Sequence, residues 1–247
     1  MSIVIQITII IAAYNANTCI AGALDSVLAQ QYADWECLIV DGASTDGTQQ
    51  TVLDYQQRDA RIRLISEPDR GIYDAFNKGV CEARGEWIYF LGADDRLMPD
   101  AFECLLADKV SHLDILYGDV DYNNAYGIVH RPSHPDPQRI RRFMPSHQAF
   151  VMRRSTILNL NGFDHQHYRL CADYHLVLRA ILNGAPTQYR PVTICLFDTT
   201  GASSAYRMNL ECYLIRQKLH SVTPLVNLYL LAKTTLLMVL RRLKAKL

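Results

Sequence analysis

The chain has 247 residues, and 49% of them are hydrophobic, which is enough to bury the core of one large domain. Its 25 Lys and Arg residues balance its 25 Asp and Glu residues, which argues against a dedicated nucleic-acid-binding protein. Seven scattered cysteines without a Cys-x-x-Cys pair favour small buried side chains in a reducing compartment over a disulfide or zinc framework.

Strand and helix patterns alternate along the first part of the chain, which is typical of βαβ units and a largely parallel sheet. The apolar start lacks a basic segment and a cleavage site, so it is interpreted as a buried strand of a cytoplasmic protein. Asn17 or Thr18 is expected to cap the first helix. The predicted strands are 3–12, 35–41, 61–66 and 86–91, and the predicted helices are 18–31, 47–58 and 72–83.

From about residue 112 the pattern changes. A loop rich in proline and charge, 131–145, is long enough to be functional rather than a simple connection. Two helices close the chain, one at 204–220 and one from Leu225 onward. Between these features the sequence predicts strands at 114–121, 126–131, 148–152 and 188–197 and helices near 154–160 and 173–183.

Acidic residues follow two predicted strands at the point where each strand ends. Asp94 and Asp95 come after the strand 86–91, and Asp41 ends the strand 35–41. Open α/β sheets bind ligands at the carboxyl ends of their strands, so these side chains are expected at one site. Adjacent carboxylates repel each other unless a cation or water screens them, and Mg²⁺ takes carboxylate and phosphate oxygens. The pair therefore predicts a metal-bound nucleoside diphosphate, with a helix N-cap beside a solvated carboxylate as the alternative.

The loop from Asp41 to Thr48 has two interpretations. Asp41 can accept two hydrogen bonds from a uridine-like nucleotide, while Ser44, Asp46 and the glycines shape the loop. The same string also suits an ordinary strand-to-helix turn with helix N-caps. Lone Asp-Gly turns are common, so only the whole string is informative.

Four ordered segments carry a resemblance to a known family. They are Tyr14-Asn15, Val40–Thr48, Glu67–Gly79 and Gly92–Asp95. Together they closely resemble the inverting family 2 glycosyltransferases with the GT-A fold. The third segment is similar to enzymes that build exopolysaccharide, O-antigen and colanic-acid-type repeat units in bacteria.

The resemblance implies an organisation for the chain. Residues 1–200 would form a single Rossmann-like α/β domain with a mostly parallel central sheet. Its nucleotide-binding half would cover about 1–110 and its acceptor-side half about 111–200. Residues 201–247 would form a C-terminal extension of amphipathic helices.

The resemblance also implies roles for the matched residues. Asp95, with Asp94 beside it, would hold the divalent metal, Mn²⁺ or Mg²⁺. Many relatives carry a further Asp where this chain has Gly92, so the acidic cluster is shorter by one carboxylate. The implied nucleotide-sugar site consists of Ala13, Tyr14 and Asn15 along the nucleoside, Asp41 and Ser44 at a uracil-type base, Asp69 and Arg70 beside the base and phosphates, and Asn77, Lys78 and Asp94 near the donor.

Asp173 is the candidate catalytic base. It lies at the start of a predicted helix, and the segment Cys171–Arg179 resembles the family motif whose Asp takes the proton of the acceptor hydroxyl. Inversion needs a carboxylate within hydrogen-bond reach of that proton. A plain helix N-cap is the alternative. His147 echoes a His-Gln pair of the relatives and is predicted near the acceptor or the diphosphate, with a structural histidine as the alternative.

The last predicted helix suits a membrane surface. The stretch Leu225–Leu240 has one charge, Lys233, and would run about 24 Å, short of a hydrocarbon core of about 30 Å. After Glu211 the chain has no acidic residue and ends in a basic cluster. We therefore expect peripheral binding to the cytoplasmic face of the inner membrane, with packing on the domain or in a homodimer as the alternative. The polar positions form a narrow stripe opposite a broad apolar face: Asn227, Thr234 and Arg241.

These features predict a metal-dependent inverting glycosyltransferase. It would move a sugar from a nucleotide sugar, expected to be UDP-linked, to a hydroxyl of a lipid-linked oligosaccharide in bacterial surface polysaccharide synthesis. A sugar nucleotidyltransferase would carry a Gly-rich basic loop after the first strand, where this chain has only Asn15–Thr18. A Rossmann dehydrogenase is disfavoured because no Gly-x-Gly-x-x-Gly follows a strand. A non-catalytic assembly protein remains an alternative, although Asp94, Asp95 and Asp173 argue against it.

Overall fold

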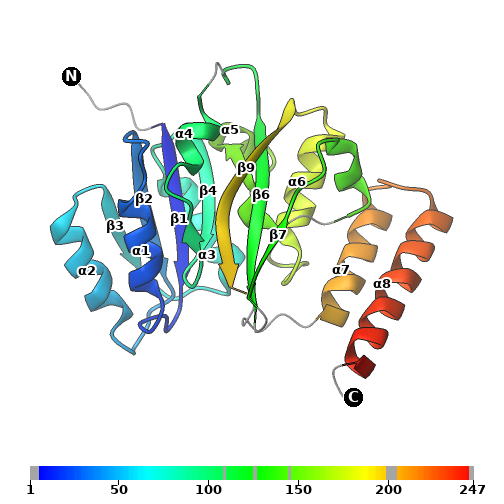
Figure 1. The fold of residues 1–247 in the computed structure, drawn as a ribbon, viewed down its shortest axis with the longest axis horizontal. Coiled ribbons are helices and arrows are strands. Elements are labelled where there is room, and N and C mark those ends of the chain that lie inside the picture. Colours follow the sequence, from blue (N-terminus) through cyan, green and yellow to red (C-terminus); the bar gives the residue numbers. More distant parts are fainter. Residues whose placement is uncertain (1–5, 108–109, 125–126, 144–145, 199–204, 245–247) are drawn as a thin grey trace.

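The computed structural model describes residues 6–107, 110–124, 127–143, 146–198 and 205–244. They form an α/β fold around a nine-stranded sheet, with a helical pair at the C-terminal end (Figure 1). The strand order is β3-β2-β1-β4-β8-β6-β9-β5, and β7 pairs with β6. The strands are β1 (Ile7–Ala13), β2 (Trp35–Asp41), β3 (Ile62–Ser66), β4 (Trp87–Gly92), β5 (Arg96–Leu97), β6 (Ile115–Asn124), β7 (Gly127–Arg131), β8 (Phe150–Arg153) and β9 (Thr187–Asp198).

The helices cover both faces of the sheet. Buried side chains of α1, α2 and α4 share one core, and those of α3, α5, α6 and α7 share the other. The helices are α1 (Ile20–Leu28), α2 (Thr48–Arg58), α3 (Ile72–Glu82), α4 (Ala101–Leu105), α5 (Arg154–Asn159), α6 (Ala172–Leu182), α7 (Ala205–Lys218) and α8 (Pro224–Lys244), with short 3-10 turns η1 (Pro137–Arg141) and η2 (His147–Ala149).

Alternate side chains of the central strands enter these two cores. Ile9 and Ile11 of β1 join the core beneath α1, whereas Ile10 joins the core beneath α3. A strand covered on both faces needs a nearly continuous apolar run, which explains the composition of β1, β2 and β4. These strands and β3 pair in parallel, as predicted. The predicted α/β fold class is confirmed.

The position of β8 decides where the second half of the chain meets the first. This strand runs antiparallel between β4 and β6, with Val151 opposite Tyr89 and Trp87 opposite Arg153. Because the two strands run in opposite directions, the residues just before β8 lie beside the carboxyl end of β4. The antiparallel pairing of β8 with β4 therefore places η2 next to the Asp94–Asp95 loop.

The predicted elements agree with the structure apart from their ends and one cap. Residues 3–5 of the first predicted strand, 126 of another and 204 of a helix lie outside the described residues. The cap prediction for α1 is wrong, because Cys19 holds the N-cap position and no side chain caps the helix there. Asn17 instead accepts a hydrogen bond from Thr51. All seven cysteines are free, but Cys81 is exposed, contrary to the expectation of burial.

Helix α8 packs on α7 with its polar side inward. Asn227 is 2% exposed; it accepts a hydrogen bond from Arg216 Nε at 2.8 Å and donates to the Tyr213 carbonyl at 3.0 Å. The apolar side faces outward, and Leu225 is 83% exposed. No helix in the described part of the chain has the length and apolar character needed to cross a membrane. Lys246 lies outside the described residues.

Replacing Asn227 by Ala is expected to lower the free energy of unfolding by about 1–3 kcal/mol, because the buried Arg216 guanidinium loses a hydrogen-bond acceptor. Urea unfolding followed by circular dichroism measures this change. Lys233→Ala, at an exposed position of the same helix, is the control and should change the value by no more than about 0.5 kcal/mol. Equal stability of the two variants would contradict the role of Asn227.

Candidate active site

The loops after β1 and β2 are fastened to each other at the carboxyl edge of the sheet. The amide of Asn15 donates to Ser44 Oγ at 2.8 Å, and its side-chain oxygen accepts from the Thr45 amide at 3.0 Å. Asn15 and Ala43 both have positive φ, 49° and 62°. Non-glycine residues rarely adopt this conformation, and it is often found where a backbone is shaped for a ligand.

Asp41 and Ser44 are both buried inside this loop pair. Asp41 accepts hydrogen bonds from the amide and hydroxyl of Ser44 and, at 2.7 Å, from the hydroxyl of Ser66. The Ser44 hydroxyl, which donates to Asp41, also accepts from the Asn15 amide. These contacts show that both residues stabilise the loop. Their contact with the nucleotide base stays a prediction.

Tyr14 and Asp69 form the open side of the same region. Tyr14 is 69% exposed, and it follows the buried Ala13 at the end of β1. A Cβ atom added to Gly42 would lie 2.6 Å from Asp69 Oδ2 and 3.3 Å from Tyr14 Cδ2. Glycine at this position therefore allows the carboxylate and the aromatic ring to approach the loop, and their predicted contact with a nucleoside stays a prediction.

Asp95 is held at the carboxyl end of β4 by the second half of the chain. Its Oδ1 accepts from the Asp198 amide at 2.9 Å and its Oδ2 from Gln148 Nε2 at 2.8 Å. Burial raises the pKa of Asp95 above its ordinary range, and the charge of Asp94 raises it further. A buried carboxylate of this kind costs free energy unless a positive charge lies nearby.

Both carboxylates face the space above Gly92. A Cβ atom added there would lie 2.4 Å from Asp95 Oδ2 and 3.0 Å from Asp94 Oδ1. The described residues contain no group of three or more His, Cys, Asp or Glu placed to hold a metal. Two carboxylates are nevertheless the protein share that Mg²⁺ commonly takes, with phosphate and water as its other ligands. The residues present therefore fit a hard divalent cation bound together with a diphosphate.

Gly92→Ala is expected to lower kcat/KM by about tenfold or more, because the added methyl group displaces the Asp95 carboxylate and misplaced catalytic groups lose rate steeply. Turnover and Mn²⁺ affinity should fall together while the circular dichroism spectrum stays unchanged. Unaltered Mn²⁺ affinity in a folded Gly92→Ala protein would show that the gap above Gly92 serves no ligand.

Asp173 is buried at the start of α6, and its two oxygens have different neighbours. Oδ1 accepts from the Tyr73 hydroxyl at 3.0 Å and from the Tyr174 amide at 2.7 Å. Oδ2 lies 3.4 Å from Nδ1 of His147. Burial, with the Asp173 charge added, raises the pKa of Tyr73 well above its usual value, so its hydroxyl remains a donor. This arrangement fixes the carboxylate and directs Oδ2 towards His147.

His147 connects the candidate base to the acidic pair. Its Nε2 is buried and has no hydrogen-bond partner among the described residues. Gln148, the next residue, holds Asp95. The 147–148 pair thus brings Asp173 and Asp95 into one site, and the predicted role of His147 toward the acceptor or the diphosphate stays a prediction.

Three residues predicted near the donor make contacts within the protein. Asn77 donates to the Phe163 carbonyl at 2.9 Å and accepts from the Phe163 amide at 2.8 Å. Lys78 donates to the Pro68 carbonyl at 2.7 Å and pairs with Glu67 at 2.9 Å. Arg70 is exposed and contacts Asp74. These contacts brace the loops around the site, and a direct role with the donor stays a prediction.

Sequence reasoning missed two site residues. Tyr73 lies in one of the four segments that carry the family resemblance, but the sequence predicted no role for its hydroxyl group. Gln148 stands beside His147 in the recognised pair and had none either. Both can be identified only when their partners are known, because Tyr73 and Asp173 are 100 residues apart and Gln148 and Asp95 are 53 apart.

Comparisons with known proteins identify the family. Residues 8–182 match the family described as Glycosyl transferase family 2. The chain belongs to this family. It is a glycosyltransferase, and the predicted resemblance and enzyme class are confirmed.

Two curated relatives illustrate the range of the family. The chain is similar to a PGL/p-HBAD biosynthesis glycosyltransferase of Mycobacterium bovis (strain BCG / Pasteur 1173P2), with 31% identity over 202 residues, or 80% of this chain and 78% of that protein. It is also similar to the UDP-Glc:alpha-D-GlcNAc-diphosphoundecaprenol beta-1,3-glucosyltransferase WfgD of Escherichia coli, with 34% identity over 125 residues, or 50% of this chain and 49% of that protein. Family 2 activity in polysaccharide or glycolipid biosynthesis follows from these matches.

Solved structures show the same fold at low sequence identity. S. aureus TarS 1-349 in complex with UDP-GlcNAc aligns with a TM-score of 0.68 and 17% identity, covering 93% of this chain and 71% of that chain. The mannosyltransferase PcManGT from Pyrobaculum calidifontis, in complex with GDP-Man and Mn²⁺, aligns with a TM-score of 0.67 and 18% identity, covering 93% and 73%. The GT-A type of fold predicted from the sequence is confirmed.

Proposed function

We propose that this glycosyltransferase moves a sugar from a UDP-sugar, with inversion, to a hydroxyl of a lipid-linked saccharide, with the help of a divalent metal. The observation that carries the proposal is the 147–148 pair, which brings Asp173 and the Asp94–Asp95 pair into one site. Residues 1–110 bind the donor and 111–200 the acceptor. The names of WfgD, with its UDP-glucose donor and diphosphoundecaprenol-linked acceptor, and of PcManGT, with Mn²⁺, support this assignment.

In the proposed reaction Asp173 takes the proton of the acceptor hydroxyl. Tyr73 and the Tyr174 amide fix Oδ1, so Oδ2 receives the proton as the hydroxyl oxygen bonds to the anomeric carbon. The bond from that carbon to the diphosphate breaks on the opposite face, which inverts its configuration. His147 would lie beside the acceptor or the diphosphate. Asp94 and Asp95 would hold Mn²⁺ or Mg²⁺, whose charge offsets that of the departing diphosphate.

The donor site proposed here lies on the loops after β1, β2 and β3. The exposed ring of Tyr14 packs on the base, and Asp69 lies beside it. The site also includes Ala13 and Asn15 along the nucleoside, Asp41 and Ser44 in the loop, Arg70 towards the phosphates, and Asn77 and Lys78 as supports.

A panel of nucleotide sugars, offered with Mn²⁺ or Mg²⁺, tests this function. The acceptor is N-acetylglucosaminyl diphosphate on a short alkyl chain, because the E. coli relative is named for such an acceptor. We expect UDP release and an elongated product of inverted anomeric configuration with one UDP-sugar, and loss of both in excess chelator. Full turnover in chelator would overturn the metal dependence. No turnover with any donor would favour a non-catalytic assembly protein.

We further propose that the α7–α8 pair binds the cytoplasmic face of the inner membrane. The outward side of α8 is apolar from Leu225 to Leu240 apart from Lys233, and no acidic residue follows Glu211 in a segment rich in Lys and Arg. A surface that is both apolar and cationic suits anionic lipid headgroups. Free cysteines fit a reducing compartment. The most exposed apolar side chains of α8 are Leu225, Leu228, Tyr229, Leu236, Leu237, Val239 and Leu240.

The double variant Leu236→Ser with Leu240→Ser is expected to bind phosphatidylglycerol-containing vesicles at least about tenfold more weakly than the wild-type protein, because two leucines no longer enter the lipid. Vesicle co-sedimentation at two salt concentrations measures the binding. Leu53→Ser, an exposed leucine on α2, is the control. Dimers of the wild-type protein in light scattering, without vesicle binding, would instead make α8 a subunit interface.

A further inference from the structure

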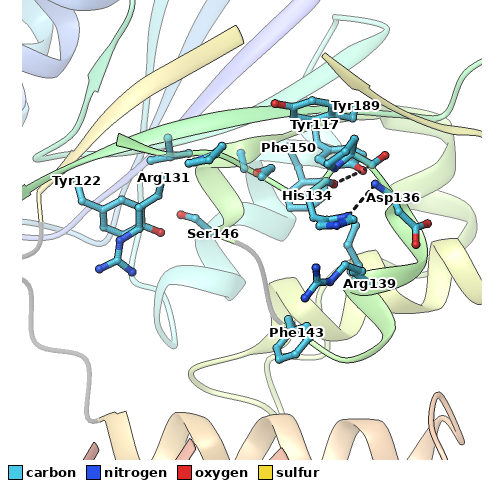
Figure 2. A pocket seen from close by; sticks show the side chains of 16 residues that line it. Tyr117, Tyr122, Arg131, His134, Asp136, Arg139, Phe143, Ser146, Phe150 and Tyr189 are labelled. Atoms are coloured by element: carbon cyan, nitrogen blue, oxygen red, sulfur yellow. Dashed lines mark hydrogen bonds between the residues drawn. The ribbon is translucent and has the colours of Figure 1, made fainter. Parts of the chain in front are cut away.

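A cavity of about 710 Å³ lies on the acceptor side of the molecule, within the usual size range of ligand pockets. It is lined by residues of β6, the end of β7, β8 and β9, and by residues of 132–143 and 146–149 (Figure 2). One wall is aromatic: Tyr117 stacks on Phe150 with ring centroids 5.5 Å apart and meets Tyr189 at 5.4 Å. The Tyr117 hydroxyl is used internally, donating to the His134 carbonyl at 2.9 Å. Tyr117 and Phe150 are only 1% and 3% exposed, so the ring surface that is open to the cavity belongs to the partly exposed Tyr189 and to Phe143.

Two arginines provide the charge of this cavity, which we call the arginine pocket. The guanidinium of Arg131 lies 4.6 Å from the ring centroid of Tyr122, and that of Arg139 lies 5.4 Å from Phe143. Stacking of this kind orients a guanidinium while its N–H groups stay available. Neither arginine forms an ion pair with a carboxylate of the described residues.

The carboxylate in the pocket lining is occupied elsewhere. Asp136 caps η1 by accepting from the Gln138 amide at 2.9 Å. In Figure 2 its carboxylate points away from the guanidinium of Arg139. The lining therefore combines exposed aromatic rings with two guanidinium groups and one carboxylate that pairs with neither of them, a combination that suits a saccharide carrying an anionic group.

The arginine pocket adjoins the catalytic site through Ser146. This residue lines the pocket, and its hydroxyl donates to Gln148 Oε1, the same side chain that holds Asp95. It also directly precedes His147, which faces Asp173. In Figure 2 Ser146 lies between the Tyr122–Arg131 end and the opposite end of the pocket. The pocket is therefore joined through Ser146 and its neighbours to the side chains that contact Asp95 and Asp173.

We infer that the arginine pocket holds the acceptor saccharide on the exposed rings of its lining, and that Arg131 and Arg139 bind a phosphate or diphosphate attached to that saccharide. The inference rests on the proposed function and assigns two residues to the phosphate or diphosphate of its acceptor. The flat C–H faces of a pyranose pack on aromatic rings, and a guanidinium binds phosphate oxygens through two parallel N–H groups. The same phosphate chemistry could come from the donor, and the experiment separates the two sources.

The experiment compares two acceptors that share N-acetylglucosamine and the same alkyl chain. One has a diphosphate between sugar and chain, and the other a neutral glycosidic bond. The variants are Arg131→Ala and Arg139→Ala. Arg58→Ala is the matched control, since Arg58 is also exposed and stacks on Tyr55 at 4.7 Å, but on α2. Each pocket variant should lower the preference for the diphosphate acceptor, measured as the ratio of kcat/KM values, by about tenfold, because a charge-assisted hydrogen bond is lost.

Two further measurements make the outcome decisive. Titration calorimetry of UDP should give the same Kd for the control and for both pocket variants. A weaker UDP affinity in the pocket variants would assign the arginines to the donor and overturn the inference, as would an unchanged acceptor preference.

Calorimetry of the diphosphate acceptor without donor separates this inference from the proposed function. Arginine-dependent binding without any transfer would support the pocket and refute the function, whereas transfer unaffected by either variant would refute the pocket alone.

Discussion

Replacing Asp173 by Asn is expected to lower kcat by about 10²–10⁴-fold, the usual contribution of a general base. The amide is nearly isosteric, and its oxygen can still accept from the Tyr73 hydroxyl and the Tyr174 amide. What it loses is the ability to take a proton at the position of Oδ2. Initial rates with a saturating UDP-sugar and acceptor measure the effect, and UDP affinity should stay within about twofold because α6 lies in the half of the domain that is proposed to bind the acceptor.

Asp164→Asn is the matched control for this variant. Asp164 lies in the segment just before α6, and it pairs with the exposed His167 rather than with any residue of the site. Its replacement should leave kcat near the wild-type value. Wild-type turnover of a folded Asp173→Asn protein would exclude the assigned base, whatever the fate of the metal site.

Asp95→Asn is expected to lower kcat/KM by about 10²-fold or more, because one of the two carboxylates that fit the cation is lost where diphosphate charge develops. Because Asp95 is buried, the variant is also expected to differ from the wild-type protein in stability. Burial raises the pKa of Asp95, so the folded chain binds this proton more tightly than the unfolded chain. Stability therefore falls as pH rises from the unfolded to the folded pKa, and the cost is complete above that window.

Asparagine carries no charge and avoids this cost. In chelator at a pH above the window, Asp95→Asn should therefore have a higher melting temperature than the wild-type protein. Added Mn²⁺ should reverse the order, because ligand binding stabilises the wild-type protein by RT ln(1 + [L]/Kd) and the variant much less. Differential scanning calorimetry with and without Mn²⁺ checks both. An identical response to Mn²⁺ in the two proteins would remove Asp95 from the metal site.

Much of the site could be predicted from local sequence because its residues stand at strand and helix ends. Asp94 and Asp95 follow a continuous apolar strand, and Asp173 opens a helix. The predicted burial of these strands and their parallel order agree with the structure. Predictions based on a local cap were weaker, since Cys19 rather than Asn17 or Thr18 precedes α1.

The amphipathic pattern of α8 does not by itself predict which side of the helix faces the protein. The sequence gives α8 a narrow polar stripe and a broad apolar face, and an isolated helix of this kind would bury the apolar face. In the structure Asn227 on the polar stripe is buried against α7, where Arg216 supplies its partner, and Leu225 and Leu236 are exposed. A hydrogen-bonding partner on another helix cannot be read from the periodicity of one helix.

The amino-acid sequence by itself determined the α/β class, the order of the elements and the carboxylates that carry the chemistry, because hydrophobic periodicity and strand-end motifs are local properties. Only the tertiary structure decided which residues meet. Antiparallel insertion of β8 between β4 and β6 brings Gln148 to Asp95 and His147 to Asp173, and it places the arginine pocket beside them. These contacts depend on sheet pairing between distant segments, whose register is set by the packing of both cores.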